Sequence, residues 1–127
     1  MQTLPKKILL VDDSATALMW ERLILKSEPY ALLTATDGDQ AVETATRELP
    51  DLILMDVVMP RMNGFEACEA LRANPATRAV PIIMVTTRSE AKSVEAGYTS
   101  GCTDYITKPI DRLELLAKVR SCLSGTP

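Results

Sequence analysis

The sequence of 127 residues contains no histidine. This absence excludes a histidine general base, a histidine-containing zinc site and a serine or cysteine nucleophile activated by histidine. The three cysteines, Cys68, Cys102 and Cys122, form no C-x-x-C pair and predict reduced thiols in a cytoplasmic protein. Any chemistry must therefore use carboxylates, hydroxyls, lysine, thiols or a group supplied by a partner.

Long apolar runs and an excess of basic residues are also absent. The apolar run near the N-terminus, Ile8 to Val11, is too short for a signal sequence or a membrane span, so we expect a cytoplasmic protein without membrane insertion. The chain has 14 lysines and arginines against 17 aspartates and glutamates, a net charge of -3. This balance predicts no direct binding of nucleic acid.

What is present is a regular alternation of short apolar runs and longer amphipathic stretches. The runs cover 8–11, 31–35, 52–55, 82–85 and 104–107, and the amphipathic stretches cover 15–26, 40–48, 65–74, 89–97 and 111–123. This pattern is typical of a parallel sheet with helices on both faces. We predict one α/β domain over residues 1–127, with its core between residues 6 and 123 and a frayed polar tail.

Side-chain spacing and capping residues add detail to the predicted helices. In the first helix, the apolar residues at helical spacing are Ala15, Leu18, Met19 and Leu23. In the last helix, the side chains expected to face the sheet are Leu113, Leu116, Val119 and Leu123. Ser89 is the expected N-cap of the fourth helix. Asp111, with Glu114 three residues later, is the expected N-cap of the last helix.

Polar residues follow four of the predicted strands. Asp12 and Asp13 follow the first, Asp56 the third, Thr86 the fourth and Lys108 the fifth. Ligands of open α/β sheets bind outside the carboxyl ends of the strands, so we expect these side chains to converge there. Taken singly, Asp12, Asp13 or Thr86 would also suit a loop position or a helix cap. Three carboxylates and one ammonium repel one another unless a divalent cation or a proton is added. Oxygen ligands of this kind favour Mg²⁺.

Four segments resemble the receiver domain of two-component response regulators, of the single-domain chemotaxis type. They are ILLVDDS from Ile8, LILMDVVMPRMNG from Leu52, IIMVTT from Ile82 and DYITKPI from Asp104. The segments occur in the order and spacing of that family and cover essentially the whole chain. The resemblance implies a flavodoxin-like, doubly wound sheet of five parallel strands in the order 2-1-3-4-5, with five helices on its two faces.

The resemblance also implies a phosphorylation-dependent signalling switch. Asp56 would accept a phosphoryl group from a phosphohistidine, and Lys108 and Thr86 would contact the phosphoryl oxygens. Because this chain has no histidine, the donor would be a sensor histidine kinase, a histidine phosphotransfer protein or a small phosphodonor. The chain would be a phosphoacceptor that promotes its own phosphorylation and slow dephosphorylation, and not an enzyme with a separate substrate.

A metal site and a switch complete the implied function. The implied Mg²⁺ ligands are Asp12, Asp13, Asp56 and the backbone carbonyl of Val58. Thr86 and Tyr105 would be the switch residues, although Tyr105 also suits a plain strand position. The output would be altered binding to a downstream effector protein, by a monomer or a phosphorylation-dependent dimer.

Three alternative functions share part of this pattern. A haloacid-dehalogenase-type phosphatase needs a second aspartate two residues after the nucleophile, where this chain has Val58 after Asp56 and Ser14 after Asp12. An FMN carrier is disfavoured because Asp12 and Asp13 would repel the phosphate. A receiver cut from a longer regulator with a DNA-binding or enzymatic output domain stays open, although the start at Met1 and the short tail favour a stand-alone protein.

Overall fold

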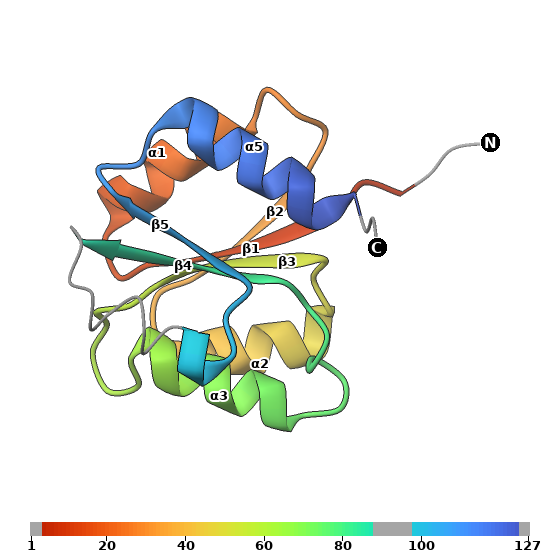
Figure 1. Cartoon of the computed structure of the whole chain (residues 1–127), viewed down its shortest axis with the longest axis vertical. Helices are drawn as coiled ribbons and strands as arrows, with labels where there is room; N and C mark the ends of the chain where they lie inside the picture. Colours follow the sequence, from red (N-terminus) through yellow and green to blue (C-terminus); the bar gives the residue numbers. More distant parts are fainter. Residues whose placement is uncertain (1–3, 88–97, 125–127) are drawn as a thin grey trace.

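The chain folds around one five-stranded parallel sheet, as a computed structural model shows for residues 4–87 and 98–124 (Figure 1). The strands are β1 Lys7–Val11, β2 Ala31–Ala35, β3 Leu52–Asp56, β4 Ile82–Thr87 and β5 Asp104–Lys108. Their spatial order is β2-β1-β3-β4-β5, and every neighbouring pair is parallel. The predicted order is therefore confirmed. Successive strands are added on one side of β1 and then, from β3 onward, on its other side, so the topological switch point lies between β1 and β3.

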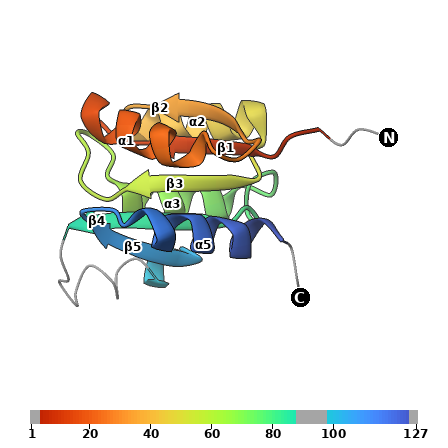
Figure 2. The ribbon, with the colours of Figure 1, turned by 90° about the horizontal axis from the view of Figure 1, so that it is seen from above.

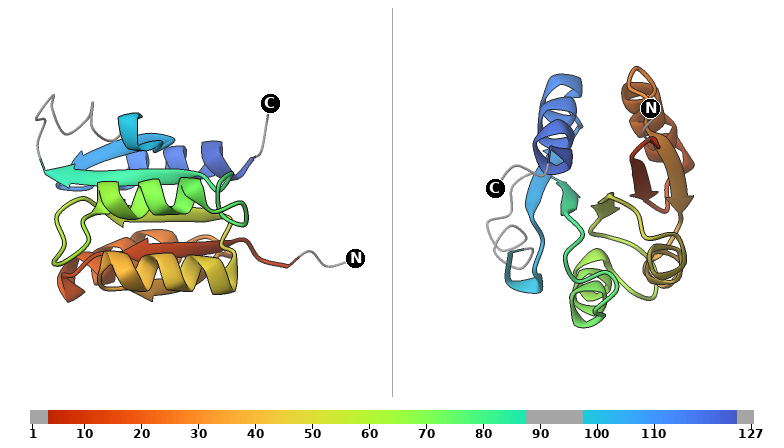
Figure 3. Two further views of the ribbon diagram at one scale, coloured as in Figure 1. Left: turned by 90° about the horizontal axis from the view of Figure 1, so that it is seen from below. Right: turned by 90° about the vertical axis from the view of Figure 1, so that its right-hand side faces the viewer.

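Helices cover both faces of the sheet. The helices α1 Ala15–Leu25 and α5 Arg112–Leu123 lie on one face, and α2 Gly38–Glu48 and α3 Gly64–Ala73 lie on the other (Figures 1 and 3). The fourth helix predicted from Ser89 lies outside the described residues. No helix within the described ranges is long and apolar enough to cross a membrane.

The strands carry the core because their side chains alternate between the two faces of the sheet. One apolar cluster, under α1 and α5, contains Ile8, Leu10, Leu52, Leu54, Ile83 and Val85. The other, under α2 and α3, contains Leu9, Val11, Ile53, Met55, Ile82 and Met84. These twelve side chains are almost completely buried. Burial on both faces explains why the central strands are continuous apolar runs.

The buried face of α1 differs from the one that apolar spacing predicts. Met19 and Leu23 are 62% and 52% exposed. The side chains that face the sheet are Leu18, Glu21, Ile24 and Leu25. The apolar residues of α1 lie all around the helix, so their spacing alone does not select the face that tertiary packing buries.

The last helix shows a smaller difference of the same kind. Leu113 is 76% exposed, whereas Leu115 is fully buried next to Leu116 and Val119. Leu115 and Leu116 precede Val119 by four and three residues, so the three share one face of α5, and Leu113 points away from it. The predicted cap is correct, because the Asp111 side chain accepts a hydrogen bond from a first-turn amide.

Side-chain caps start the two helices that follow β2 and β3. Asp37 caps α2, which therefore begins at Gly38, two residues earlier than predicted. Asn63 and Glu66 form a reciprocal capping box at the start of α3. Because α2 follows β2 and α3 follows β3, both helix N-termini lie at the carboxyl edge of the sheet, toward which the strands point (Figure 2).

Candidate functional site

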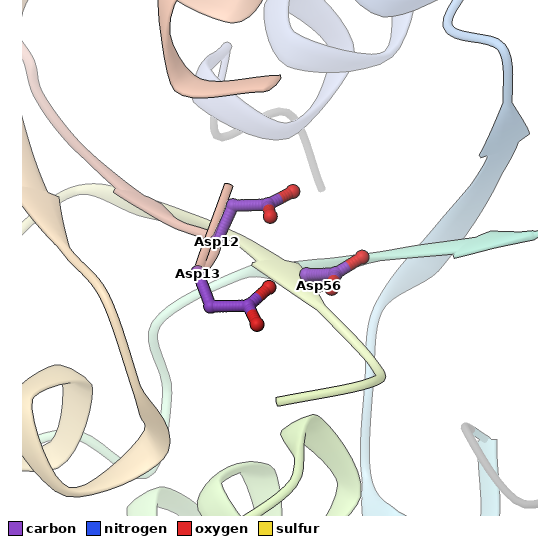
Figure 4. Close-up of side chains that lie close together, drawn as sticks. All are labelled: Asp12, Asp13 and Asp56. Atoms are coloured by element: carbon purple, nitrogen blue, oxygen red, sulfur yellow. The ribbon is translucent and has the colours of Figure 1, made fainter. Parts of the chain in front are cut away.

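Three aspartates meet at the carboxyl edge of the sheet, where β1 and β3 end side by side. Asp12 and Asp13 follow β1, Asp56 is the last residue of β3, and their side chains point to the same side of the strand ends (Figure 4). Each offers one carboxylate oxygen, and these three oxygens lie within 4.8 Å of one another. Asp12 and Asp56 are buried, whereas Asp13 is exposed. The cluster is therefore held in the protein on one side and open to solvent on the other.

The neighbouring backbone fixes the position of Asp12. Its amide donates a hydrogen bond to the Ala35 carbonyl over 3.1 Å, which extends the pairing of β1 with β2. One of its carboxylate oxygens accepts a hydrogen bond from the Ser14 amide over 2.9 Å. Ser14 in turn caps α1 through its hydroxyl. The turn from β1 into α1 thus sets the direction of the Asp12 carboxylate.

Lys108 connects two of these carboxylates from the end of β5. Its Nζ lies 3.2 Å from Asp12 Oδ2 and 3.0 Å from Asp56 Oδ1. The lysine side chain is 27% exposed, so it reaches the cluster from the protein surface. The peptide bond between Lys108 and Pro109 is cis. Four of the five residues predicted at the strand ends are therefore in one cluster.

The charges of the cluster do not balance. Burial raises the pKa of the Asp56 carboxyl; the hydrogen bond from Lys108 opposes this, and the charge of Asp12 adds to it. Burial acts to lower the pKa of Lys108, but its bond to Asp56 and the attraction of both carboxylates raise it overall, so it carries its proton. One ammonium beside three carboxylates leaves an excess of negative charge. This set of hard oxygen donors fits a divalent cation such as Mg²⁺.

Thr86 lies next to the cluster but is turned toward its own strand. The residue is buried, and its hydroxyl donates a hydrogen bond to the Thr87 carbonyl over 3.0 Å. Val58, whose backbone carbonyl was a predicted ligand, lies in the loop after β3, and its side chain is 71% exposed. The structure therefore places both residues near Asp56. Among the residues that the structure describes, neither side chain interacts with the three carboxylates.

Tyr105 lies on β5, partly buried against the core cluster of α2 and α3. Its ring makes a T-shaped contact with the Tyr98 ring, with the centroids 6.0 Å apart and the ring planes at 88°. The Lys118 ammonium lies 5.2 Å from the Tyr105 centroid and also donates to the Tyr105 carbonyl over 2.6 Å. Tyr98, from the segment before β5, and Lys118, from α5, thus lie next to this ring.

Glu21 is an ionisable residue near the site that the residue pattern did not indicate. Its side chain is 1% exposed, and its Oε1 has no hydrogen-bond partner within residues 4–87 and 98–124. Burial is the main cause that raises its pKa to about 8; the charge of Asp12 adds to this, and Lys108 opposes it. Glu21 follows Leu18 by three residues and precedes Leu25 by four, so it shares the buried face of α1 with them, a face that apolar spacing alone does not identify.

The single tryptophan is a natural reporter next to the site. Trp20 donates a hydrogen bond from Nε1 to the Ile110 carbonyl over 3.3 Å, which joins α1 to the loop before α5. Trp20, Ser14 and Lys108 line the same groove. A change at Lys108 should therefore alter the environment of the indole ring.

Comparisons with known proteins agree with this geometry. Residues 8–120 match the family model described as the response regulator receiver domain. The chain is 39% identical over 119 residues to protein PilH of Pseudomonas aeruginosa, covering 94% of this chain and 98% of PilH. It is 42% identical over 115 residues to response regulator PleD of Caulobacter vibrioides, covering 91% of this chain but 25% of PleD. The chain thus spans a quarter of one relative and nearly all of the other.

A solved structure has the same fold. The receiver domain of a sensor histidine kinase from Pseudomonas aeruginosa superimposes with a TM-score of 0.89 at 33% sequence identity, covering 96% of this chain and 100% of that chain. That receiver domain has a magnesium ion coordinated in its active-site cleft.

Proposed function

We propose that this chain, which belongs to the response regulator receiver domain family, accepts a phosphoryl group on Asp56. Receiver domains are phosphorylation-dependent signalling switches, and this chain is one of them. The observation that carries the assignment of Asp56 is its contact with Lys108 over 3.0 Å, within a cluster of two further carboxylates at the carboxyl edge of the sheet. Asp12 also contacts Lys108, over 3.2 Å, but its other carboxylate oxygen accepts a hydrogen bond from the Ser14 amide, whereas no backbone amide donates to the Asp56 carboxylate among the described hydrogen bonds.

The proposed reaction is a phosphoryl transfer in which Asp56 is the nucleophile. A carboxylate oxygen of Asp56 forms a bond to the phosphorus while the bond from phosphorus to the imidazole nitrogen of the donor breaks, and the imidazole then takes a proton from solvent. The donor histidine belongs to a kinase or a phosphotransfer protein, because this chain has none. The Lys108 ammonium faces the position of the new phosphoryl oxygens and offsets their charge.

The carboxylates also suit the metal ion that this reaction needs. Asp12, Asp13, Asp56 and the backbone carbonyl of Val58 would hold Mg²⁺, which when bound offsets the charge of the phosphoryl oxygens. The excess of negative charge in the cluster supports this proposal, as does the magnesium ion in the similar receiver domain of the histidine kinase.

Magnesium should therefore stabilise the folded protein. At a free concentration about 100 times its Kd, binding adds about 2.7 kcal/mol to the free energy of unfolding. We expect the Asp13→Ala protein to lose most of this gain, because the variant lacks one carboxylate of the cluster. The control is Asp39→Ala, which removes an exposed carboxylate from the first turn of α2. Thermal unfolding with MgCl₂ and with NaCl at equal ionic strength measures the effect. An equal gain in Asp13→Ala and wild type would contradict the proposed ligand.

The proposed switch uses Thr86 and Tyr105. New phosphoryl oxygens on Asp56 would attract the Thr86 hydroxyl away from the Thr87 carbonyl. The movement of Thr86 would leave space for the Tyr105 ring to turn inward, away from Tyr98 and Lys118. The surface formed by β5 and α5 would then differ between the two states, and an effector protein would distinguish them.

The remaining parts of the proposal concern the setting of the reaction. Residues 1–127 form one receiver domain, which acts in the cytoplasm. It takes its phosphoryl group from a sensor histidine kinase or a histidine phosphotransfer protein, and it promotes this transfer and the slow loss of the group to water. Its output is binding to an effector protein, as a monomer or a phosphorylation-dependent dimer.

Intact-mass measurement tests the phosphoacceptor. Wild type, Asp56→Asn and Asp39→Asn are incubated with Mg²⁺ and acetyl phosphate. Wild type and Asp39→Asn should gain one phosphoryl group that hydroxylamine removes, because an acyl phosphate reacts with this nucleophile. Asp56→Asn should gain none. The assignment is wrong if Asp56→Asn is labelled as extensively as wild type.

A further inference from the structure

Arg61 has an unusual backbone conformation close to the phosphoacceptor. It lies five residues after Asp56 in the loop of residues 57–63, which joins β3 to α3. Its φ angle is +66°, in the left-handed region that residues with a Cβ atom rarely adopt. The other residue of this kind in the described part of the chain is Leu49, which ends α2 as its C-cap. Arg61 caps no helix, so its conformation needs another explanation.

The side chain of Arg61 makes a short ion pair with a buried carboxylate. Its Nη2 lies 2.7 Å from Asp37 Oδ2; the Asp37 side chain is 6% exposed and that of Arg61 is 72% exposed. The other carboxylate oxygen of Asp37 accepts a hydrogen bond from the Gln40 amide over 2.8 Å and caps α2. Asp37 therefore uses one oxygen for the helix and one for the loop. The ion pair joins the 57–63 loop to the N-terminus of α2.

The two ends of the same loop are packed too closely to admit a side chain. A Cβ atom at Gly64 would clash with the Asp56 carbonyl, and one at Gly38 would clash with the Met62 carbonyl. The Gly64 amide donates a hydrogen bond to the Val57 carbonyl over 2.9 Å. The backbone on both sides of Val58 is thus held against β3 and α2. A shift at Arg61 would therefore affect the residues next to Asp56.

We propose that Arg61 and Asp37 are positioning residues that hold the 57–63 loop, and with it the Val58 backbone carbonyl, beside the acidic cluster. This inference rests on the proposed function, in which that carbonyl is a metal ligand. Groups that orient a ligand from outside the metal site affect metal affinity although they do not touch the ion. The unusual conformation of Arg61 is retained because it directs the guanidinium to Asp37.

Four variants separate the ion pair from other effects. Asp37→Asn keeps an oxygen that caps α2 but removes the charge that attracts Arg61. Arg61→Ala removes the guanidinium, Arg61→Lys retains a cation, and Arg61→Gly removes the side chain but favours a positive φ angle. The matched control is Arg47→Ala, because Arg47 is 60% exposed and pairs with Glu43 and Glu48 on the surface of α2, away from the loop.

Two measurements give independent results. Hydrogen exchange of the Gly64 amide in metal-free protein reports the order of the loop, and Trp20 fluorescence during MgCl₂ titration reports metal affinity. In Asp37→Asn, Arg61→Ala and Arg61→Gly, we expect faster Gly64 exchange and about tenfold weaker magnesium binding. Arg61→Lys should lie between these variants and wild type, and Arg47→Ala should match wild type in both measurements.

Two outcomes would overturn the inference. One is that Asp37→Asn and Arg61→Ala match wild type in both measurements. The other is that Arg61→Gly matches wild type, since only the backbone conformation would then matter. Failure of the proposed function looks different: wild type would gain no phosphoryl group on Asp56, whereas the exchange of Gly64 in metal-free protein would still depend on the ion pair.

Discussion

Replacing Glu21 by glutamine should make the protein less sensitive to high pH. In wild type, Glu21 should lower the free energy of unfolding by on the order of 5 kcal/mol above pH 8, relative to acidic pH, and the glutamine variant should not show this loss. Burial raises the pKa of Glu21 from 4.5 to about 8. Between these two values, the folded protein keeps a proton that the unfolded chain has released. The free energy of unfolding therefore falls as the pH rises through this window and levels off above it. Glutamine has no proton to lose, so its contribution is independent of pH.

Urea unfolding near both ends of this pH window measures the effect. The difference in stability between Glu21→Gln and wild type should grow toward the alkaline end, while other titrating groups, such as Asp56, are common to both proteins. Glu21→Met should be more stable than Glu21→Gln, because it leaves no buried amide without a partner. Glu43→Gln, at a glutamate 78% exposed on α2, should match wild type throughout. A difference for Glu21→Gln that stays constant with pH would refute the buried, protonated carboxyl.

Lys108→Met should reduce the rate of Asp56 phosphorylation by acetyl phosphate about 10²- to 10³-fold, the usual cost of losing one group that stabilises transition-state charge. The ammonium lies 3.0 Å from Asp56, beside the position that the proposed phosphoryl group would occupy. The bonds to both carboxylates also raise its pKa, which keeps it charged. The initial rate of phosphoryl gain, followed by intact mass, measures the effect.

Lys118→Met is the matched control for this variant. Lys118 has the same exposed fraction, 27%, and also pairs with two carboxylates, those of Asp104 and Glu114, but it lies on α5 outside the aspartate cluster. We expect its phosphorylation rate to stay close to that of wild type. Equal losses in both variants would indicate a general effect of removing a surface lysine. An unchanged rate in Lys108→Met would remove this residue from the proposed reaction.

Much of the fold follows from the sequence, for a physical reason. A parallel strand buried on both faces must be a continuous apolar run, so runs such as the one from Leu52 mark the strands clearly. Parallel strands also end at one edge, so the residues after the runs, Asp12, Asp56 and Lys108, were predicted to lie close together. The order of the strands came from the family resemblance, because apolar runs do not specify which strands are neighbours.

Other features depend on contacts that a pattern of residues does not contain. The burial of Glu21 depends on which face of α1 the sheet selects, and apolar residues lie all around that helix. The ion pair of Arg61 with Asp37 depends on the backbone path of a loop. The direction of the Thr86 hydroxyl follows its hydrogen bond to the carbonyl of the next residue. Each of these features needs the tertiary structure.

Identification of the modified residue tests the central claim most directly. Phosphorylated wild type is reduced with borohydride, which converts an aspartyl phosphate to homoserine, and its peptides are sequenced by mass spectrometry. We expect homoserine at position 56 in protein treated with both acetyl phosphate and Mg²⁺. Homoserine at another aspartate, such as Asp12 or Asp13, with none at position 56, would contradict it.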